Sequence, residues 1–294
     1  MKNKSMKNKK LVFLDIDGTL IDKNYSSNCP DLKKLILLLQ KRGFVFAINS
    51  NRSLEDLLPI SKRFGIKGPL VGENGSFIYF QGAKKTIYLL NKVERDRVKK
   101  TIEKVKKEIV NYGKKYLNLD NILVLKTDTV KALSNPSQFI KKNNLGKSSK
   151  KTLLLLENIY RKFTASLYLK KIDKGRLIYP RKYSKNIIKH LEKVFSKRKG
   201  VTITFSHTYG NILIYSNKVS KRTAIEYLKN AVYKHYSFSA IGDEINDFKM
   251  IENLGDFFTT NNSNKNVKDK AIFFSEKTFT EGVYEILNYL YKNA

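Results

Sequence analysis

The junction between residues 11–14 and residues 15–20 constrains the fold of this chain more than any other segment. Residues 11–14 read Leu-Val-Phe-Leu, and the next six read Asp-Ile-Asp-Gly-Thr-Leu. A short, continuous apolar run that ends in a glycine turn is typical of a strand buried in a parallel sheet. Because ligands of such sheets bind beyond the carboxyl ends of the strands, we expect these acidic residues to project into a binding site.

Asp15 and Asp17 have the spacing for two different chemical roles. A carboxylate at a strand end can attack phosphorus, which divides one difficult hydrolysis into two easier displacements. A second carboxylate nearby can protonate the leaving alcohol and later take a proton from water. Gly18 would allow the bend that directs the two side chains differently. The alternative is an ordinary Asp-Gly turn at the end of a strand.

Ser50 and Lys221 have positions that suit binding of a phosphate group. Ser50 comes shortly after the apolar stretch 44–48, where a hydroxyl could hold a phosphate oxygen. Lys221 lies in the first turn of an expected helix with Ser220 as its N-cap. A cation there opposes the helix dipole, so its presence suggests an anion nearby. Each residue alone could equally be an ordinary turn residue or one of the 58 Lys and Arg residues.

Asp243 and Asp247 follow a third apolar stretch, residues 238–241. Clustered carboxylates at a strand end suit Mg²⁺, which prefers oxygen ligands and retains several waters. A helix N-terminus decorated with favourable negative charge is the alternative for this pair. The order of these acidic, hydroxyl and basic positions, each preceded by the expected secondary structure, favours a phosphoryl-transfer site.

With these motifs in this order, the chain resembles the haloacid dehalogenase (HAD) superfamily of phosphohydrolases. The resemblance implies a nucleophile, an acid/base, a phosphate-binding hydroxyl and a cation, in that order, at Asp15, Asp17, Ser50 and Lys221. It also implies a Mg²⁺ site at Asp15, the backbone carbonyl of Asp17, Asp243 and Asp247, the last acting through water or through the lysine.

The order of predicted strands and helices indicates an α/β fold, a doubly wound parallel-sheet (Rossmann-like) core with an inserted α+β cap domain. Residues 11–82 and 208–294 are predicted to form the core, and residues 83–207 the cap. Residues 1–10 read as a basic, disordered tail. An insert between the second and third motifs resembles the large C2-type caps of Cof-like, sucrose-phosphate and mannosyl-3-phosphoglycerate phosphatases.

Candidate substrate contacts follow from the same resemblance. In the core they are Gly18, Thr19, Asn51, Arg52 and Asn74, and in the cap Arg161, Lys162 and Ser166. Asn51 stands where the family usually has glycine, which departs from the pattern. A plain hairpin connector around Asn74 and a solvated amphipathic strand after Arg161 are the alternatives.

Composition limits the remaining classes of function. The chain has 294 residues, one cysteine, Cys29, and no apolar run that approaches the thickness of a bilayer, so we expect a soluble, cytoplasmic protein. A net charge of +32 allows non-specific adhesion to polyanions. The lysines occur along the whole chain without a nucleic-acid-binding module, so no specific nucleic acid and no membrane is expected as a partner. The sequence carries no signal for an oligomeric state.

The sequence therefore predicts a Mg²⁺-dependent phosphomonoester hydrolase with an aspartyl-phosphate intermediate and a sugar or glycosyl phosphate as substrate. A sugar phosphomutase of the same superfamily is one alternative, because it would use the same residues and return the phosphoryl group to the sugar. A non-catalytic, basic RNA-binding protein on a HAD-like fold is the other.

Overall fold

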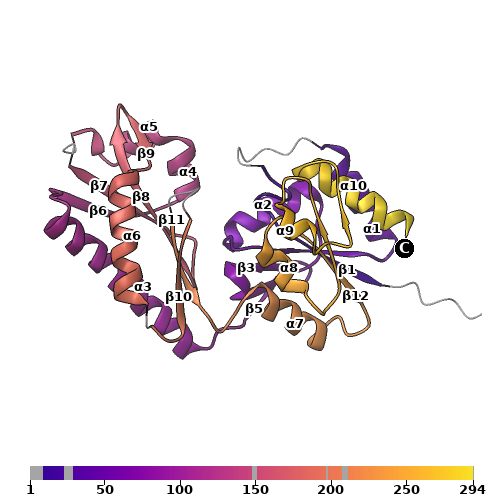
Figure 1. The fold of residues 1–294 in the computed structure, drawn as a ribbon. Coiled ribbons are helices and arrows are strands. Elements are labelled where there is room, and N and C mark those ends of the chain that lie inside the picture. Colours follow the sequence, from indigo (N-terminus) through magenta and orange to yellow (C-terminus); the bar gives the residue numbers. More distant parts are fainter. Residues whose placement is uncertain (1–8, 23–28, 148–150, 197, 207–210, 294) are drawn as a thin grey trace, which may run out of the picture. The chain divides into compact units, whose positions relative to one another are not determined.

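The computed structural model describes residues 9–22, 29–147, 151–196, 198–206 and 211–293. The chain divides into two compact units (Figure 1). The first unit combines Met1–Leu89 with Val219–Ala294, and the second is Leu90–Lys218. Residues 1–8 of the predicted tail 1–10 and the predicted boundary at 207/208 lie outside the described residues, whereas Lys10, also predicted to be tail, begins the first strand and pairs with Ser237.

The first unit is built on a sheet with the strand order β14-β13-β12-β1-β2-β3-β4-β5. Its strands are β1 (Lys10–Leu14), β2 (Val45–Asn49), β3 (Leu70–Gly72), β4 (Phe77–Phe80), β5 (Lys85–Tyr88), β12 (Ser237–Ile241), β13 (Asp256–Thr259) and β14 (Phe273–Phe274). The pairs from β14 to β3 are parallel, whereas β3, β4 and β5 pair antiparallel. The four apolar residues of β1 are inaccessible to solvent, as expected for a central parallel strand covered on both faces.

Helices cover both faces of this sheet (Figure 1). They are α1 (Asp31–Lys41), α2 (Leu54–Phe64), α7 (Lys221–Ala231), α8 (Ile245–Ile251), α9 (Lys265–Lys268) and α10 (Phe279–Lys292). Leu11 and Phe13 of β1 pack in one apolar cluster with residues of α7 and α8. Helices α1 and α10 contact each other on the opposite face. The predicted doubly wound α/β core is thereby confirmed.

The second unit contains a sheet with the strand order β10-β11-β8-β7-β6, and β9 pairs with β8 beside this path. Its strands are β6 (Asn121–Thr127), β7 (Thr152–Asn158), β8 (Ala165–Asp173), β9 (Arg176–Ile178), β10 (Val201–Ser206) and β11 (Asn211–Ser216). Its α-helices are α3 (Lys92–Tyr116), α4 (Thr129–Ser134), α5 (Pro136–Lys142) and α6 (Arg181–Phe195), with a 3₁₀ turn at Leu145–Lys147.

Alternate residues of β7 bury against different helices. Leu153 and Leu155 belong to the apolar cluster that contains α3 and α6, whereas Leu154 and Leu156 belong to the cluster that contains α4 and α5. The second unit therefore has helices on both faces of its sheet, because successive side chains of a strand point to opposite faces.

The limits of the inserted unit differ from the predicted limits of 83 and 207. Strand β5 pairs with β4 in the first sheet, so the second unit begins only at Leu90. Strand β11, predicted to belong to the returning core, pairs antiparallel with β10 and β8 in the second sheet. The second unit consequently ends at Lys218. Within the part of the chain that the structure describes, no helix is both long enough and apolar enough to cross a membrane.

The 3₁₀ turn Glu73–Gly75 packs against the start of α7. Glu73 and Asn74 have positive φ angles of 46° and 58°, and Gly75 has φ 87°. A Cβ atom on Gly75 would lie 2.0 Å from the backbone carbonyl oxygen of Ser220. Glycine is therefore required here for two reasons, the backbone conformation and the close approach of α7.

We expect Gly75→Ala to lower the free energy of unfolding by about 2 kcal/mol or more, because it combines left-handed backbone strain with a backbone clash. The measurement is urea denaturation followed by circular dichroism. Gly82→Ala is the matched control, since a Cβ atom at Gly82 meets nothing within 4 Å. The control should change stability by no more than about 1 kcal/mol. Equal stabilities of the two variants would contradict this account of the turn.

Candidate active site

Three parallel strands of the first sheet end at the same edge and carry the predicted acidic and hydroxyl residues. Leu14 pairs with Ile48 of β2 and with Ile241 of β12, so the three strands end within one residue of one another. Asp15 follows β1 directly, and Ser50 follows β2 directly. The loop after β12 carries Asp243, and the first turn of α8 carries Asp247. Residues more than 190 positions apart in sequence are thus brought to one place by strand pairing.

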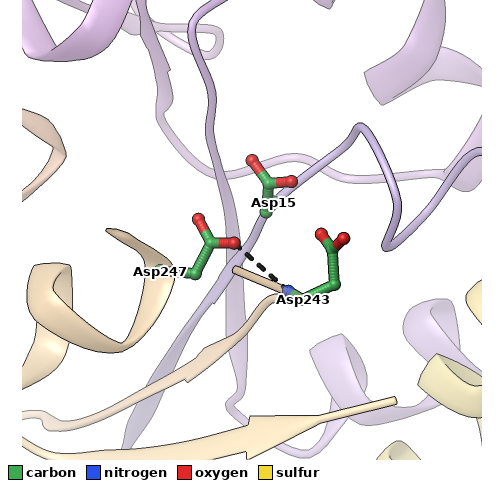
Figure 2. A group of neighbouring side chains, drawn as sticks. All are labelled: Asp15, Asp243 and Asp247. Atoms are coloured by element: carbon green, nitrogen blue, oxygen red, sulfur yellow. Dashed lines mark hydrogen bonds between the residues drawn. The ribbon is translucent and has the colours of Figure 1, made fainter. Parts of the chain in front are cut away.

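Asp15, Asp243 and Asp247 form a carboxylate cluster at this edge (Figure 2). Each offers an oxygen atom, and these three atoms lie within 4.8 Å of one another. Asp15 and Asp247 are buried, with exposed fractions of 5% and 2%, and Asp243 is half-buried. Asp247 lies in the first turn of α8, where its Oδ2 accepts hydrogen bonds from the backbone N–H groups of Asp243 and Glu244 at 3.2 and 3.0 Å. These bonds fix the loop after β12.

Lys221 joins the cluster from α7. Its Nζ donates hydrogen bonds to Asp15 Oδ1 at 2.6 Å and to Asp247 Oδ1 at 2.7 Å. The helix start is fixed by a capping box, in which the Ser220 side chain accepts from the Thr223 N–H and the Thr223 hydroxyl accepts from the Ser220 N–H. The unfavourable interaction of a lysine with a helix N-terminus is offset here by two charge-assisted hydrogen bonds.

The cluster has more negative charge than one ammonium group can balance. Burial and the nearby Asp247 carboxylate raise the pKa of Asp15 well above its usual value, although Lys221 acts in the opposite direction. Burial and the same Asp247 carboxylate raise the pKa of Asp243 to about 7. Burial alone would lower the pKa of Lys221, but Asp15 and Asp247 raise it above the usual lysine value. An additional cation would stabilise the ionised carboxylates.

The donor set fits Mg²⁺ or a similarly hard divalent cation. All three candidate ligands are carboxylate oxygens, which such ions prefer over nitrogen or sulfur. Thr19 Oγ1 donates a hydrogen bond to Asp243 Oδ1 at 3.0 Å and so orients this carboxylate. Gly18 has φ 90°, and a Cβ atom there would lie 2.2 Å from Asp243 Oδ2. The Asp-Gly turn after β1 therefore allows Asp243 to approach the cluster.

Asp17 is not one of the three clustered carboxylates and pairs with Arg52. The guanidinium group donates from Nε to Oδ2 at 3.0 Å and from a terminal nitrogen to Oδ1 at 2.6 Å. This is a two-point ion pair with a half-buried arginine, and the Asp17 side chain remains 48% exposed. Arg52, predicted as a substrate contact, is thus placed against the predicted acid/base. The predicted metal contact of the Asp17 backbone carbonyl stays a prediction.

The segment after β2 is tied to the turn Glu73–Gly75. The Glu73 N–H donates to the Arg52 carbonyl at 2.9 Å, and the Asn74 N–H donates to the Ser50 carbonyl at 3.4 Å. Ser50 is buried, and its Oγ accepts from the Arg52 N–H at 3.4 Å. The substrate roles of Asn51 and Asn74 stay predictions.

Three predicted substrate contacts lie in the second unit. Arg161 donates a hydrogen bond to Thr164 Oγ1 at 2.9 Å. Ser166 lies in β8, is buried, and accepts from Asn211 Nδ2 at 3.0 Å, so its hydroxyl supports pairing of β8 with β11. The roles predicted for these residues and for Lys162 in binding substrate stay predictions.

Two asparagines outside the predicted set of site residues support the cluster. Asn49 is fully buried at the end of β2, and its Nδ2 donates to the Lys221 backbone carbonyl at 3.0 Å. Asn262 donates from Nδ2 to the Gly18 carbonyl at 2.8 Å. An amide residue that ends an otherwise apolar strand is a signal that could have indicated Asn49. Asn262 lies in a polar loop whose sequence is typical of an ordinary turn.

Comparison with known proteins assigns this chain to a protein family. A family model described as haloacid dehalogenase-like hydrolase matches residues 12–287. A HAD/Cof-like hydrolase from Plasmodium vivax has a similar solved structure, with a TM-score of 0.61 and 20% identity over 99% of this chain and 98% of that chain.

Two curated relatives match over shorter segments. The phosphoglycolate phosphatase of Staphylothermus marinus is 32% identical over 72 residues, 24% of this chain and 30% of the relative. The mannosyl-3-phosphoglycerate phosphatase of Pyrococcus furiosus is 28% identical over 118 residues, 36% of this chain and 46% of the relative. The chain thus matches less than half the length of these curated relatives.

We expect Mg²⁺ to stabilise the folded protein, because a ligand that binds only the native state adds its binding free energy to stability. At a concentration 100 times its dissociation constant, the gain is about 2.7 kcal/mol. The measurement is the thermal midpoint in EDTA and in excess Mg²⁺. Asp243→Asn should remove most of this gain, since it removes a carboxylate of the cluster.

Asp256→Asn is the matched control for this experiment. Asp256 begins β13 and pairs with Lys10 at 3.8 Å, so it lies at the other end of its strand from the cluster. This variant should keep the full response to Mg²⁺. A response that survives in Asp243→Asn would mean that the ion binds elsewhere.

Proposed function

We propose, because the chain belongs to the haloacid dehalogenase-like hydrolases, that it is a Mg²⁺-dependent phosphomonoester hydrolase with an aspartyl-phosphate intermediate. Membership of this family agrees with the resemblance seen in the four motifs and with the predicted class of enzyme. The observation that carries the proposal is the buried Asp15 carboxylate, held 2.6 Å from Lys221 Nζ beside two further carboxylates. This arrangement provides a fixed nucleophile and a site for positive charge.

Asp15, Asp243 and Asp247 are the residues that we assign to the metal site, with the Asp17 carbonyl as a further ligand. When bound, Mg²⁺ neutralises negative charge on the transferring phosphoryl group.

In the first step, an oxygen of Asp15 forms a bond to phosphorus, and the bond from phosphorus to the ester oxygen breaks. Lys221 binds Asp15 Oδ1, so we assign the attack to Oδ2. The protonated Asp17 carboxyl gives its proton to the leaving alcohol. Lys221 and the Ser50 hydroxyl are assigned to the phosphoryl oxygens, where charge is concentrated in the transition state.

In the second step, Asp17 takes a proton from a water molecule, and the water oxygen forms a new bond to phosphorus. The bond between phosphorus and Asp15 breaks, which releases inorganic phosphate and restores the Asp15 carboxylate. Asp17 is protonated again at the end of the cycle. Its position outside the carboxylate cluster and its exposure suit a group that must exchange protons with both the alcohol and water.

A sugar or glycosyl phosphate is the substrate class that we propose. Two curated relatives support it by name, the mannosyl-3-phosphoglycerate phosphatase and a glucosyl-3-phosphoglycerate/mannosyl-3-phosphoglycerate phosphatase from Persephonella marina. Cys29 is the only cysteine of the chain and cannot form an internal disulfide, which supports a reducing compartment such as the cytoplasm.

The test of the proposed reaction is phosphate release from a panel of sugar, nucleotide and small-acid phosphates, with Mg²⁺ or EDTA. We expect Mg²⁺-dependent release that falls by about 10³-fold or more in Asp15→Asn, because the amide cannot serve as the nucleophile. Asp256→Asn should retain activity. An isomeric sugar phosphate in place of free phosphate would reveal a mutase, and activity that persists in Asp15→Asn would contradict the mechanism.

The pairing of Arg52 with Asp17 leads to a second expectation. Arg52→Lys keeps the charge but loses the two-point geometry, so it should lower kcat by about tenfold while KM changes little. If Arg52 instead binds the substrate, KM should rise and kcat should remain. Steady-state kinetics on the best substrate of the panel distinguishes the two roles. Arg63→Lys, on the exposed side of α2, is the control.

A further inference from the structure

Positive charge is concentrated in the second unit of the chain. Residues 90–218 contain 32 of the 58 Lys and Arg residues and 9 of the 26 Asp and Glu residues, so they carry +23 of the net +32. The first unit has 26 basic and 17 acidic residues and carries only +9. Basic residues thus occur along the whole chain, but their excess over acidic residues is concentrated in the second unit.

A biased nucleotide composition of the genome does not explain this difference. Such a bias enriches Asn together with Lys, and it acts on both units alike. Asn is nearly even, with 11 among the 129 residues of the second unit and 16 among the 165 of the first. The basic residues alone are concentrated, which points to a property of the second unit itself.

Two helices of this unit present lysines on one surface. Helices α3 and α6 contact each other, and their apolar residues belong to one buried cluster against the sheet (Figure 1). With 100° between successive residues, the positions opposite these buried faces are mostly lysine. We call the following exposed residues the lysine face: Lys100, Lys104, Lys107 and Lys114 of α3, with Lys189 and Lys193 of α6.

The lysine face has little compensating negative charge. Within the described part of the chain, none of its six lysines pairs with a carboxylate. Three exposed acids border its six lysines, Asp96 and Glu103 of α3 and Glu192 of α6, and Glu103 also pairs with Lys106, so positive charge remains in excess. Close like charges without partners repel one another, and a polyanion would relieve this repulsion.

We propose that the lysine face binds the phosphate backbone of a nucleic acid. From Lys100 to Lys114, the face extends roughly 21 Å along α3, at 1.5 Å per residue. This length matches roughly six nucleotides at 3.4 Å each along one strand. Lysine binds phosphate as a point charge without reading bases, so the binding is independent of sequence.

An anionic membrane is the less suitable partner for this surface. Helices that bind membranes insert an apolar face among the lipids. The apolar faces of α3 and α6 are buried against their own sheet, and the lysine face offers charge alone. The proposed binding is independent of the phosphatase chemistry, because the lysine face contains none of the proposed catalytic residues.

The experiment measures binding of the full chain to fluorescein-labelled RNA and DNA of 20 nucleotides, by anisotropy, between about 50 and 200 mM salt. The face variant replaces four lysines by glutamine, at Lys100, Lys104, Lys107 and Lys189. The control variant replaces four exposed lysines of the first unit by glutamine, at Lys33, Lys41, Lys62 and Lys67. The two variants have equal net charge, and glutamine preserves helix propensity.

We expect the face variant to bind at least about tenfold more weakly near 200 mM salt, and its plot of log affinity against log salt to be shallower by about 3, because four phosphate contacts are lost. The control variant should lose less than about threefold. Equal losses in the two variants would show that net charge alone drives binding and would overturn the proposal. No binding of the wild-type chain above about 100 mM salt would also overturn it.

Two further measurements make the result specific. Thermal melting by circular dichroism tests folding of each variant, and Lys104→Gln with Lys107→Gln is a smaller variant with the same expected direction. Vesicles rich in phosphatidylserine test the membrane alternative. Vesicle binding that matches RNA binding and requires the same lysines would overturn the assignment to a nucleic acid. None of these readouts depends on phosphatase activity, so the two proposals can fail separately.

Discussion

The ammonium group of Lys221 is the contact on which the site depends, because it joins groups from three parts of the fold. It lies 2.6 Å from Asp15 after β1 and 2.7 Å from Asp247 in α8. Without it, buried carboxylates would face one another with no positive charge among the described side chains of the cluster. Burying such a charge without a partner is strongly unfavourable. The lysine therefore stabilises the first unit as well as its proposed chemistry.

One ammonium is nevertheless too little charge to balance three carboxylates, and this imbalance supports the proposed metal site. The pKa values of Asp15 and Asp243 are raised although Lys221 is adjacent. A purely structural cluster would gain stability by losing one of its acids. Perturbed carboxylates that stay together at a sheet edge support the proposal that an external cation completes the charge balance.

Sequence patterns predicted those parts of the site that depend on local structure. Asp15 and Asp243 follow apolar strands, and Lys221 follows a helix cap, so each could be located from its neighbours in the chain. The Asn49 amide contacts the carbonyl of a residue 172 positions away, and no local pattern encodes that contact. Strand β11 has the alternation of any half-buried strand, and only its pairing with β8 assigns it to the second unit. Helices α4 and α5, with 6 and 7 residues, are too short for helical periodicity to be recognised.

The close contact of Gly75 with Ser220 has a mechanical consequence. The chain returns from the second unit at Val219, only two positions before Lys221, so the backbone beside the lysine must be held by contacts within the first unit. The Ser220 carbonyl rests against the Gly75 backbone, and Asn49 holds the Lys221 carbonyl. These two contacts hold the backbone of Ser220 and Lys221 in place. The position of the Lys221 ammonium group is therefore set by contacts within the first unit.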